Sequence, residues 1–243
     1  LTIVTGPPGA GKSAIMGRIA VLSDPHYRKM AEQEKALTDV IYETLPQKGI
    51  IDVAVHAKGK TLSDCIGSIA AGLDIQISEK NKNEPIILLD AITSLHKRVT
   101  ILVDALDEAK PGHPFKIGER LLAPLSQLPY VRVLVGTRRS PTGAIIPEFE
   151  PRHSRLHALF GEKVQIVDLE DEYQSKQDIR EFVQRRLMDS HHRNDFSGID
   201  RISRKVAERA AGIFLYARVV TRTMEEMDNL DDKLPRDALE AFV

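Results

Sequence analysis

Residues 6–13 have the sequence Gly-Pro-Pro-Gly-Ala-Gly-Lys-Ser and match every fixed position of the phosphate-loop (Walker A) pattern G-x-x-x-x-G-K-[ST]. Such a loop aims several backbone amides at one anion, and glycine permits the tight curl that a Cβ would obstruct. An apolar strand pattern, residues 1–5, precedes the loop, and a helical pattern, residues 14–20, follows it. The alternative is a Gly/Pro turn that binds nothing, and the flanking strand and helix argue against it.

Phosphate binding assigns a role to each part of this loop. Lys12 brings a positive charge to β- and γ-phosphates, and Ser13 supplies a hydroxyl for Mg²⁺. The helix that begins near Gly11 directs its positive end at the same oxygens. The predicted nucleotide-binding residues are Gly6, Pro7, Pro8, Gly9, Ala10, Gly11, Lys12, Ser13 and Ala14.

A second motif follows the apolar run 99–103, where Asp104-Ala105-Leu106-Asp107-Glu108 places three acids within five residues. Asp104 stands where a strand would deliver a carboxylate to the Mg²⁺ shell, so Ser13 and Asp104 are the predicted metal ligands. Three such acids would repel one another, which favours a cation at this site. Glu108 or Asp107 is expected to orient or deprotonate the attacking water, and the sequence does not choose between them. The alternative is a solvated acidic turn.

A third motif, Gly136-Thr137-Arg138-Arg139, ends another apolar strand pattern. In a parallel sheet such strand ends face the crevice where ligands bind, so Arg138 is predicted to reach a γ-phosphate and to report its presence. The alternative is a pair of exposed arginines on a loop. The predicted catalytic residues are Lys12, Asp104, Asp107, Glu108 and Arg138.

Near-continuous apolar strands separated by helical segments predict an α/β fold, in which helices sandwich a five-stranded parallel sheet of the P-loop NTPase type. Helices are expected over residues 27–45, over 62–73 with Thr61 or Ser63 as the cap, and up to His96. The expected strands cover residues 1–5, 51–56, 99–103, 131–135 and 164–167.

Strand patterns cease beyond Asp168, and residues 175–187, 199–211 and 213–227 have helical spacing. The chain is therefore expected to hold a nucleotide-binding domain, residues 1–170, and a small helical lobe, residues 171–243.

The charge composition limits which binding partners the sequence favours. Lys plus Arg number 34 against 35 Asp plus Glu, so no global field favours nucleic acid or an anionic membrane.

The single Cys65, on an apolar helix face with Ile66 and Ile69, is expected to be a buried thiol in a reducing compartment. Neither a signal peptide nor a spanning apolar run is evident, so a cytoplasmic location is expected. The start inside a strand, without Met, suggests a segment of a longer polypeptide.

With these motifs the chain resembles the NACHT-type branch of the STAND signalling NTPases. The Asp104–Glu108 segment reproduces the acidic (Walker B) motif of that family, and residues 211–217 resemble the start of a helix in its helical lobe. Leu234-Pro235 resembles the beginning of its winged-helix domain, and the rest of that domain is not expected within residues 1–243. Residues 53–61 and 133–139 are similar to segments of bacterial, chiefly actinobacterial, multidomain members.

The resemblance implies a weak ATPase that acts as a switch, with ADP in a closed form and ATP in an open, oligomerising form. It implies ATP/ADP and Mg²⁺ as cofactors, fused N-terminal effector and C-terminal sensor or repeat domains, and a homo-oligomer in the ATP state. Two alternatives remain. One is a phosphotransferase such as a small-molecule kinase, whose arginine-rich lid would use Arg180, Arg185 and Arg186. The other is a non-hydrolysing scaffold.

Overall fold

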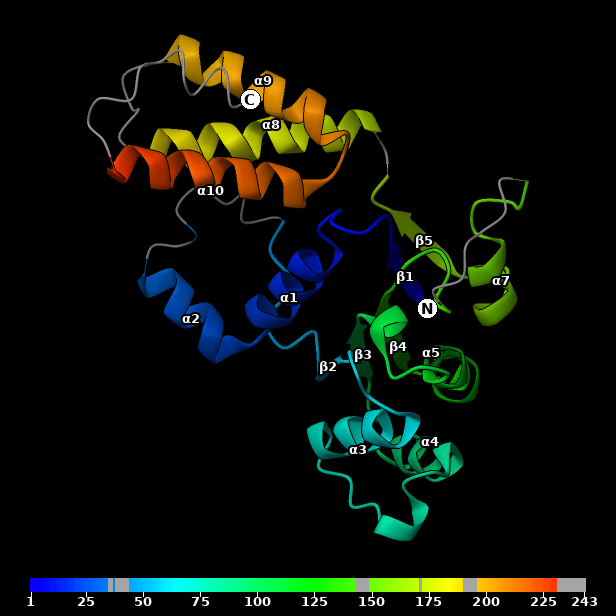
Figure 1. Cartoon of the computed structure of the whole chain (residues 1–243). Coiled ribbons are helices and arrows are strands. Elements are labelled where there is room, and N and C mark those ends of the chain that lie inside the picture. Colours follow the sequence, from blue (N-terminus) through cyan, green and yellow to red (C-terminus); the bar gives the residue numbers. More distant parts are fainter. Residues whose placement is uncertain (35–36, 38–43, 143–148, 171, 190–195, 231–243) are drawn as a thin grey trace. The chain divides into compact units, whose positions relative to one another are not determined.

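A computed structural model describes residues 1–34, 37, 44–142, 149–170, 172–189 and 196–230 (Figure 1). The chain divides into two compact units. The α/β unit consists of residues 1–5 and 12–167, and the helical unit consists of residues 6–11 and 168–243. Most of the predicted phosphate loop therefore groups with the helical unit, whereas Lys12 and Ser13 belong to the α/β unit.

Five strands form one sheet with the order β2-β3-β4-β1-β5. The β2–β3, β3–β4 and β1–β4 pairs are parallel. Each of the five strand predictions is confirmed to within two residues at either end, because apolar runs that are buried on both faces have a distinctive pattern. The strands are β1 (Thr2–Thr5), β2 (Val53–His56), β3 (Val99–Asp104), β4 (Val131–Gly136) and β5 (Gln165–Asp168).

Alternate residues of the strands divide the α/β core into two parts, since successive side chains point to opposite faces. One set joins the buried side chains of α3 to α7 in the main core, and it comprises Ile3, Val53, Val55, Val99, Ile101, Val103, Val133 and Val135. Leu102 of β3 belongs to the other set, and α1 (Lys12–Ser23) packs against β3 and β4 with Met16 fully buried. Helices therefore cover the sheet as the sequence predicts.

Two further helices of the α/β unit start at caps. Asp24 caps α2 (Pro25–Gln33) by accepting hydrogen bonds from the amides of His26 and Tyr27. The helix expected over residues 27–45 is described only to Gln33, and residues 35–36 and 38–43 lie outside the described part. Thr61 caps α3 (Leu62–Gly72), and α4 (Pro85–Ser94) ends two residues before His96.

Several short helices have no counterpart in the sequence predictions. A helical stretch runs from His113 to Gln127, and Pro114, Gly118 and Pro124 interrupt its pattern. Pro114 occupies the first turn of α5, where no amide partner is lost, and Pro124 follows directly after η4, in the first turn of α6. These elements are α5 (His113–Ile117), the π-helical η4 (Gly118–Leu122), α6 (Ala123–Gln127), α7 (Ser154–Phe160) and the 3₁₀ turns η2 (Glu79–Asn81) and η3 (Leu106–Glu108).

Three helices build the helical unit, namely α8 (Glu172–Asp189), α9 (Phe196–Ala210) and α10 (Phe214–Leu230). They confirm the three predicted helices and share a core that includes Ile179, Val183, Val206 and Ala217. Leu234-Pro235 lies outside the described residues. Within the described part, no helix is both long enough and apolar enough to cross a membrane.

Candidate functional site

The phosphate-loop segment has the backbone that its sequence demands. Gly6, Gly9 and Gly11 have φ values of 145°, 81° and 95°, and the amide of Ala10 donates to the carbonyl of Pro7 at 3.3 Å. Helix α1 begins at Lys12, immediately after the loop. The first amides of a helix have no partner within the helix itself, so they can serve an anion at its start.

Within the helical unit the loop packs against the start of α10. The amide of Leu215 donates to the carbonyl of Gly9 at 3.1 Å. A Cβ on Gly9 would lie 2.8 Å from Cγ2 of Ile213, so only glycine fits this close approach. The 211–217 segment, noted in the sequence as a family-like motif, thus contacts the phosphate loop directly.

Asp104 ends β3 and its carboxylate stands against the backbone of the next strand. A Cβ on Gly136 would lie 2.6 Å from Asp104 Oδ1 and 3.2 Å from Cγ of Met16, so Gly136 makes room for this carboxylate. His56 is opposite Asp104 in the strand register, and its Nδ1 lies 3.4 Å from Asp104 Oδ2. Asp104 is thus a nearly buried carboxylate at the carboxyl edge of the sheet, as predicted.

Asp107 is tied to Arg138, the arginine that follows β4. Ala105 adopts a left-handed conformation, with φ 56° and ψ 44°, and turns the chain sharply into η3. Asp107 Oδ1 then accepts from the backbone amide of Arg138 at 3.0 Å, and Oδ2 lies 2.8 Å from Arg138 Nε. Only 5% of the Asp107 side chain is exposed. Asp107 therefore holds Arg138 in place, and both of its oxygens are engaged.

Glu108 faces a different cation. Its Oε2 lies 2.8 Å from Nζ of Lys58, in the turn that follows β2. The hydrogen bond from Lys58 holds the pKa of Glu108 below its ordinary value, although partial burial opposes the shift. The same hydrogen bond raises the pKa of Lys58. Lys58 was not among the predicted site residues, and a single lysine in a loop gives no signal that would have identified it.

Lys12 completes this group, which we call the strand-end cluster. Burial lowers the pKa of Lys12, the charge of Asp107 opposes this shift, and the charge of Arg138 adds to it. Asp104 and Glu108 also lie within electrostatic range of Lys12. The strand-end cluster comprises Lys12, His56, Lys58, Asp104, Asp107, Glu108 and Arg138.

Cations face two of the three acids, so the repulsion between the acids does not by itself require a metal ion. His56, Arg138 and Lys58 each contact one of the acids. In the described part of the chain, no group of three or more His, Cys, Asp or Glu residues could hold a metal ion. A metal here would have one carboxylate, that of Asp104, together with a hydroxyl.

Two buried hydroxyls lie beside the cluster. Thr5 ends β1 and Thr137 follows β4, and the amide of Thr137 donates to the carbonyl of Val4 at 3.1 Å. Both side chains are fully buried, and neither hydroxyl has a hydrogen-bond partner among the described residues. An unpaired buried hydroxyl costs about 1–3 kcal/mol, which marks the carboxyl edge of the sheet as a place for a polar ligand or water. The sequence showed both threonines but no reason to single them out.

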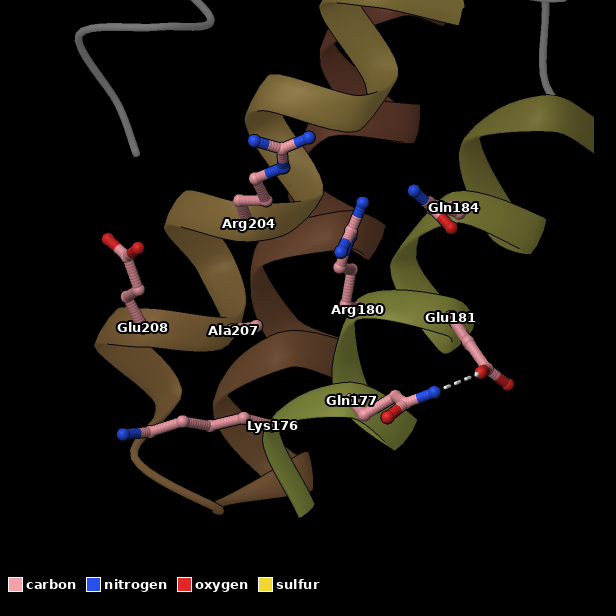
Figure 2. A pocket seen from close by; sticks show the side chains of 8 residues that line it. All are labelled: Lys176, Gln177, Arg180, Glu181, Gln184, Arg204, Ala207 and Glu208. Carbon is pink, nitrogen blue, oxygen red and sulfur yellow. Dashed lines mark hydrogen bonds between the residues drawn. The ribbon is translucent and has the colours of Figure 1, made fainter. Parts of the chain in front are cut away.

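The helical unit carries a second charged depression, here called the helical groove, of about 450 Å³ between α8 and α9. Figure 2 shows Arg180 and Gln184 extending from α8 and Arg204 from α9. Asp200 accepts from Arg180 at 2.6 Å and from Gln184 at 3.0 Å, and its other oxygen lies 2.5 Å from Arg204. The lining residues are Lys176, Gln177, Arg180, Glu181, Gln184, Arg204, Ala207 and Glu208.

The predicted inert thiol is confirmed as a buried group. Cys65 lies on α3 with 1% of its surface exposed, and burial raises its pKa to about 11. The thiolate that nucleophilic chemistry requires is thus disfavoured at neutral pH.

Comparisons with known proteins support the fold. No protein-family model and no curated protein matches the chain. Among solved structures, the Orc1 protein of Aeropyrum pernix in complex with DNA aligns with a TM-score of 0.56 at 16% identity, over 99% of this chain and 58% of that one. The Drosophila ORC structure bound to DNA aligns with a TM-score of 0.51 at 15% identity, over 99% and 54%. The chain thus spans little more than half of those proteins, and it has the α/β fold of P-loop NTPases.

Proposed function

We propose that this chain is the ATP-binding, slowly hydrolysing module of a NACHT-type STAND signalling switch within a larger cytoplasmic protein. In this proposal residues 1–170 form the nucleotide-binding domain and residues 171–243 form a helical lobe. The nucleotide state would control conformation and assembly into a homo-oligomer.

The observation that carries the proposal is the composition of the strand-end cluster. Three motifs far apart in the sequence, represented by Lys12, Asp104 and Arg138, meet within electrostatic range of one another at the carboxyl edge of the sheet. Ligands of open α/β sheets bind at this edge. A polyphosphate requires cations, and its metal requires a carboxylate, so this combination suits a nucleotide better than an uncharged ligand.

Mg²⁺ fits the residues that the cluster offers. Asp104 presents a carboxylate in the space that Gly136 leaves open, and Ser13 is exposed at the start of α1. One carboxylate and one hydroxyl, completed by water and phosphate oxygens, match the preference of Mg²⁺. When bound, the metal ion would neutralise charge that develops on the β- and γ-phosphate oxygens.

Glu108 is the residue we assign to the attacking water. Both oxygens of Asp107 are engaged by Arg138, whereas Glu108 has 39% of its side chain exposed and pairs with the ammonium of Lys58. In the reaction, the water oxygen bonds to the γ-phosphorus and its proton passes to Glu108. The bond from the γ-phosphorus to the bridging oxygen breaks, and its electron pair stays on the β-phosphate, so ADP and inorganic phosphate leave.

Arg138 is the residue we assign to sensing the γ-phosphate. Asp107 engages its Nε and its backbone amide, which orients the guanidinium and leaves the terminal nitrogens as the groups that would meet an anion. A residue that contacts only the γ-phosphate distinguishes ATP from ADP, which is the requirement for a nucleotide-controlled switch.

The phosphotransferase alternative has less support. Its lid would need mobile arginines, but Arg180, Arg185 and Arg186 pair with Asp200, Glu181 and Glu225 inside the helical unit. A non-hydrolysing scaffold differs from our proposal only in lacking turnover, so measurement of ATP hydrolysis separates the two.

Replacement of Lys12 by Ala tests the proposal. The change should weaken MgATP binding by about 1–3 kcal/mol, because a charge-assisted contact to phosphate is lost. Isothermal titration calorimetry measures the affinity, and thermal unfolding verifies that the variant is folded. Arg18→Ala is the matched control, since it removes an exposed cation from the same helix. Equal MgATP affinity in Lys12→Ala and the wild type would refute nucleotide binding at this loop.

A further inference from the structure

The turn after β2, residues 57–60, is bonded through its main chain to the acidic segment. The amide of Ala57 donates to the carbonyl of Asp104 and the amide of Gly59 donates to the carbonyl of Glu108, both at 2.8 Å. On the return, the amide of Lys110 donates to the carbonyl of Lys60 at 3.0 Å. The main chain therefore fixes where Lys58 stands relative to Glu108.

The Lys58–Glu108 ion pair is too exposed to be explained by stability alone. The exposed fractions of the two side chains are 66% and 39%, and solvent screens exposed ion pairs of this kind so that they contribute little to stability. The neighbouring pair of Asp107 and Arg138 differs, because Asp107 is nearly buried. Glu108 is thus the acid of the cluster whose cation can release it at little cost.

We propose that Lys58 is a positioning residue for Glu108, holding its carboxylate at one place in the cluster and restraining it as a base, so that hydrolysis is slow. This inference rests on the proposed function, because it concerns the regulation of the same reaction. The turn after β2 would then control the rate of the reaction, a role that the proposed function does not assign to any residue.

Several charged groups face Glu108, and Lys58 is the dominant one. The hydrogen bond from Lys58 lowers the pKa of Glu108 most, and Arg138 and His56 lower it further from the ends of the neighbouring strands. Lys12 also interacts with Glu108 from α1. Removal of Lys58 leaves Arg138, His56 and Lys12 in place, so the pKa of Glu108 should rise toward its ordinary value, and the carboxylate should become a stronger base.

Lys58→Met tests the inference, because it keeps the apolar stem and removes the ammonium. The first measurement is a carbon-13 NMR titration of the Glu108 carboxyl group without nucleotide. Its midpoint should move to higher pH in Lys58→Met and stay in place in Lys58→Arg. Lys60→Met is the matched control in the same turn, and its midpoint should also stay in place.

The second measurement is single-turnover hydrolysis of MgATP across a range of pH. In Lys58→Met the acid limb of the rate profile should move to higher pH, and the plateau rate should rise by about threefold as the base strengthens. MgATP affinity should change less than about twofold, since Lys58 is assigned to the base and not to the phosphates.

The outcomes separate the inference from the proposed function. An unmoved Glu108 titration in Lys58→Met refutes the inference, even if Glu108→Gln is inactive and the proposed function stands. A moved titration together with a raised plateau rate supports it. A Glu108→Gln variant as active as the wild type removes the assigned base, and the inference is then overturned together with that part of the proposed function.

Discussion

The strand-end cluster and the helical groove both contain several ion pairs, but they are built in different ways. In the cluster, the charges come from segments that follow β2, β3 and β4, and main-chain bonds fix their positions. In the groove, Asp200 and Arg204 are four residues apart on α9, and Arg180 reaches Asp200 from α8. The Asp200–Arg204 pair has the i,i+4 spacing that stabilises a helix surface. The Arg180–Asp200 pair links α8 to α9.

The two regions also differ in their local costs: the unpaired atom of the groove is Nε of Arg180, whose guanidinium is still held by Asp200 through its Nη2, whereas the cluster combines backbone strain with unpaired hydroxyls. Ala105 adopts a left-handed conformation that is rare for a residue with a Cβ, and two buried hydroxyls, on Thr5 and Thr137, are unpaired among the described residues. Such local costs typically persist at sites that bind a ligand. Changes in the cluster should therefore alter ligand handling at little cost in stability, and changes in the groove should have the reverse effect.

The largest expected effect is that of Glu108→Gln on hydrolysis. The amide keeps the shape of the side chain but cannot accept the proton from water, so the single-turnover rate should fall by about 10²–10⁴-fold. ATP affinity should remain within about twofold. The melting temperature should change little, because the pair with Lys58 is exposed.

Asp107→Asn is the matched control for that prediction. It should weaken the hold on Arg138, and hence the preference for ATP over ADP, because Asp107 engages Arg138 with both of its oxygens. If Asp107→Asn is the inactive variant and Glu108→Gln hydrolyses ATP normally, the roles assigned to the two acids are reversed.

A smaller effect is expected from Arg138→Ala. Loss of a charge-assisted contact that only the γ-phosphate makes should weaken binding of a non-hydrolysable ATP analogue by about tenfold, and binding of ADP by less than about twofold. Calorimetric titration with the two nucleotides measures the difference. Arg139→Ala is the control, since adjacent residues of an extended chain point in opposite directions. Equal losses for the analogue and ADP would exclude Arg138 as the sensor.

Much of the fold was predictable because buried parallel strands are apolar along their length, as in residues 99–103 and 131–135. The phosphate loop and the strand-end acids could be recognised in the sequence for the same reason, because each directly follows an apolar strand pattern. The basic side chain that faces each acid was not predictable. It depends on the left-handed turn at Ala105 and on the bonds of residues 57–60, and neither leaves a periodic signal. Likewise, Asp200 pairs with Arg180 across two helices, 20 residues apart in sequence.

The smallest expected effect comes from the groove, where Asp200→Asn should lower stability and leave nucleotide binding unchanged. Arg180, followed by Arg204, holds the pKa of Asp200 below its ordinary value of 3.8. A carboxyl group with a lowered pKa in the folded state contributes stability above its unfolded pKa, and that contribution is lost as the pH falls through the folded value. The melting temperature of Asp200→Asn should thus be lower by roughly 1–3 °C at pH 7, and the difference should shrink as the pH falls below 3.8. Glu208→Gln, on the same helix and in the lining of the groove, is the control for removal of a negative charge as such. A loss of stability that is independent of pH would mean that Asp200 acts through packing or through neutral hydrogen bonds, and a loss of MgATP affinity would remove the distinction drawn between the two regions.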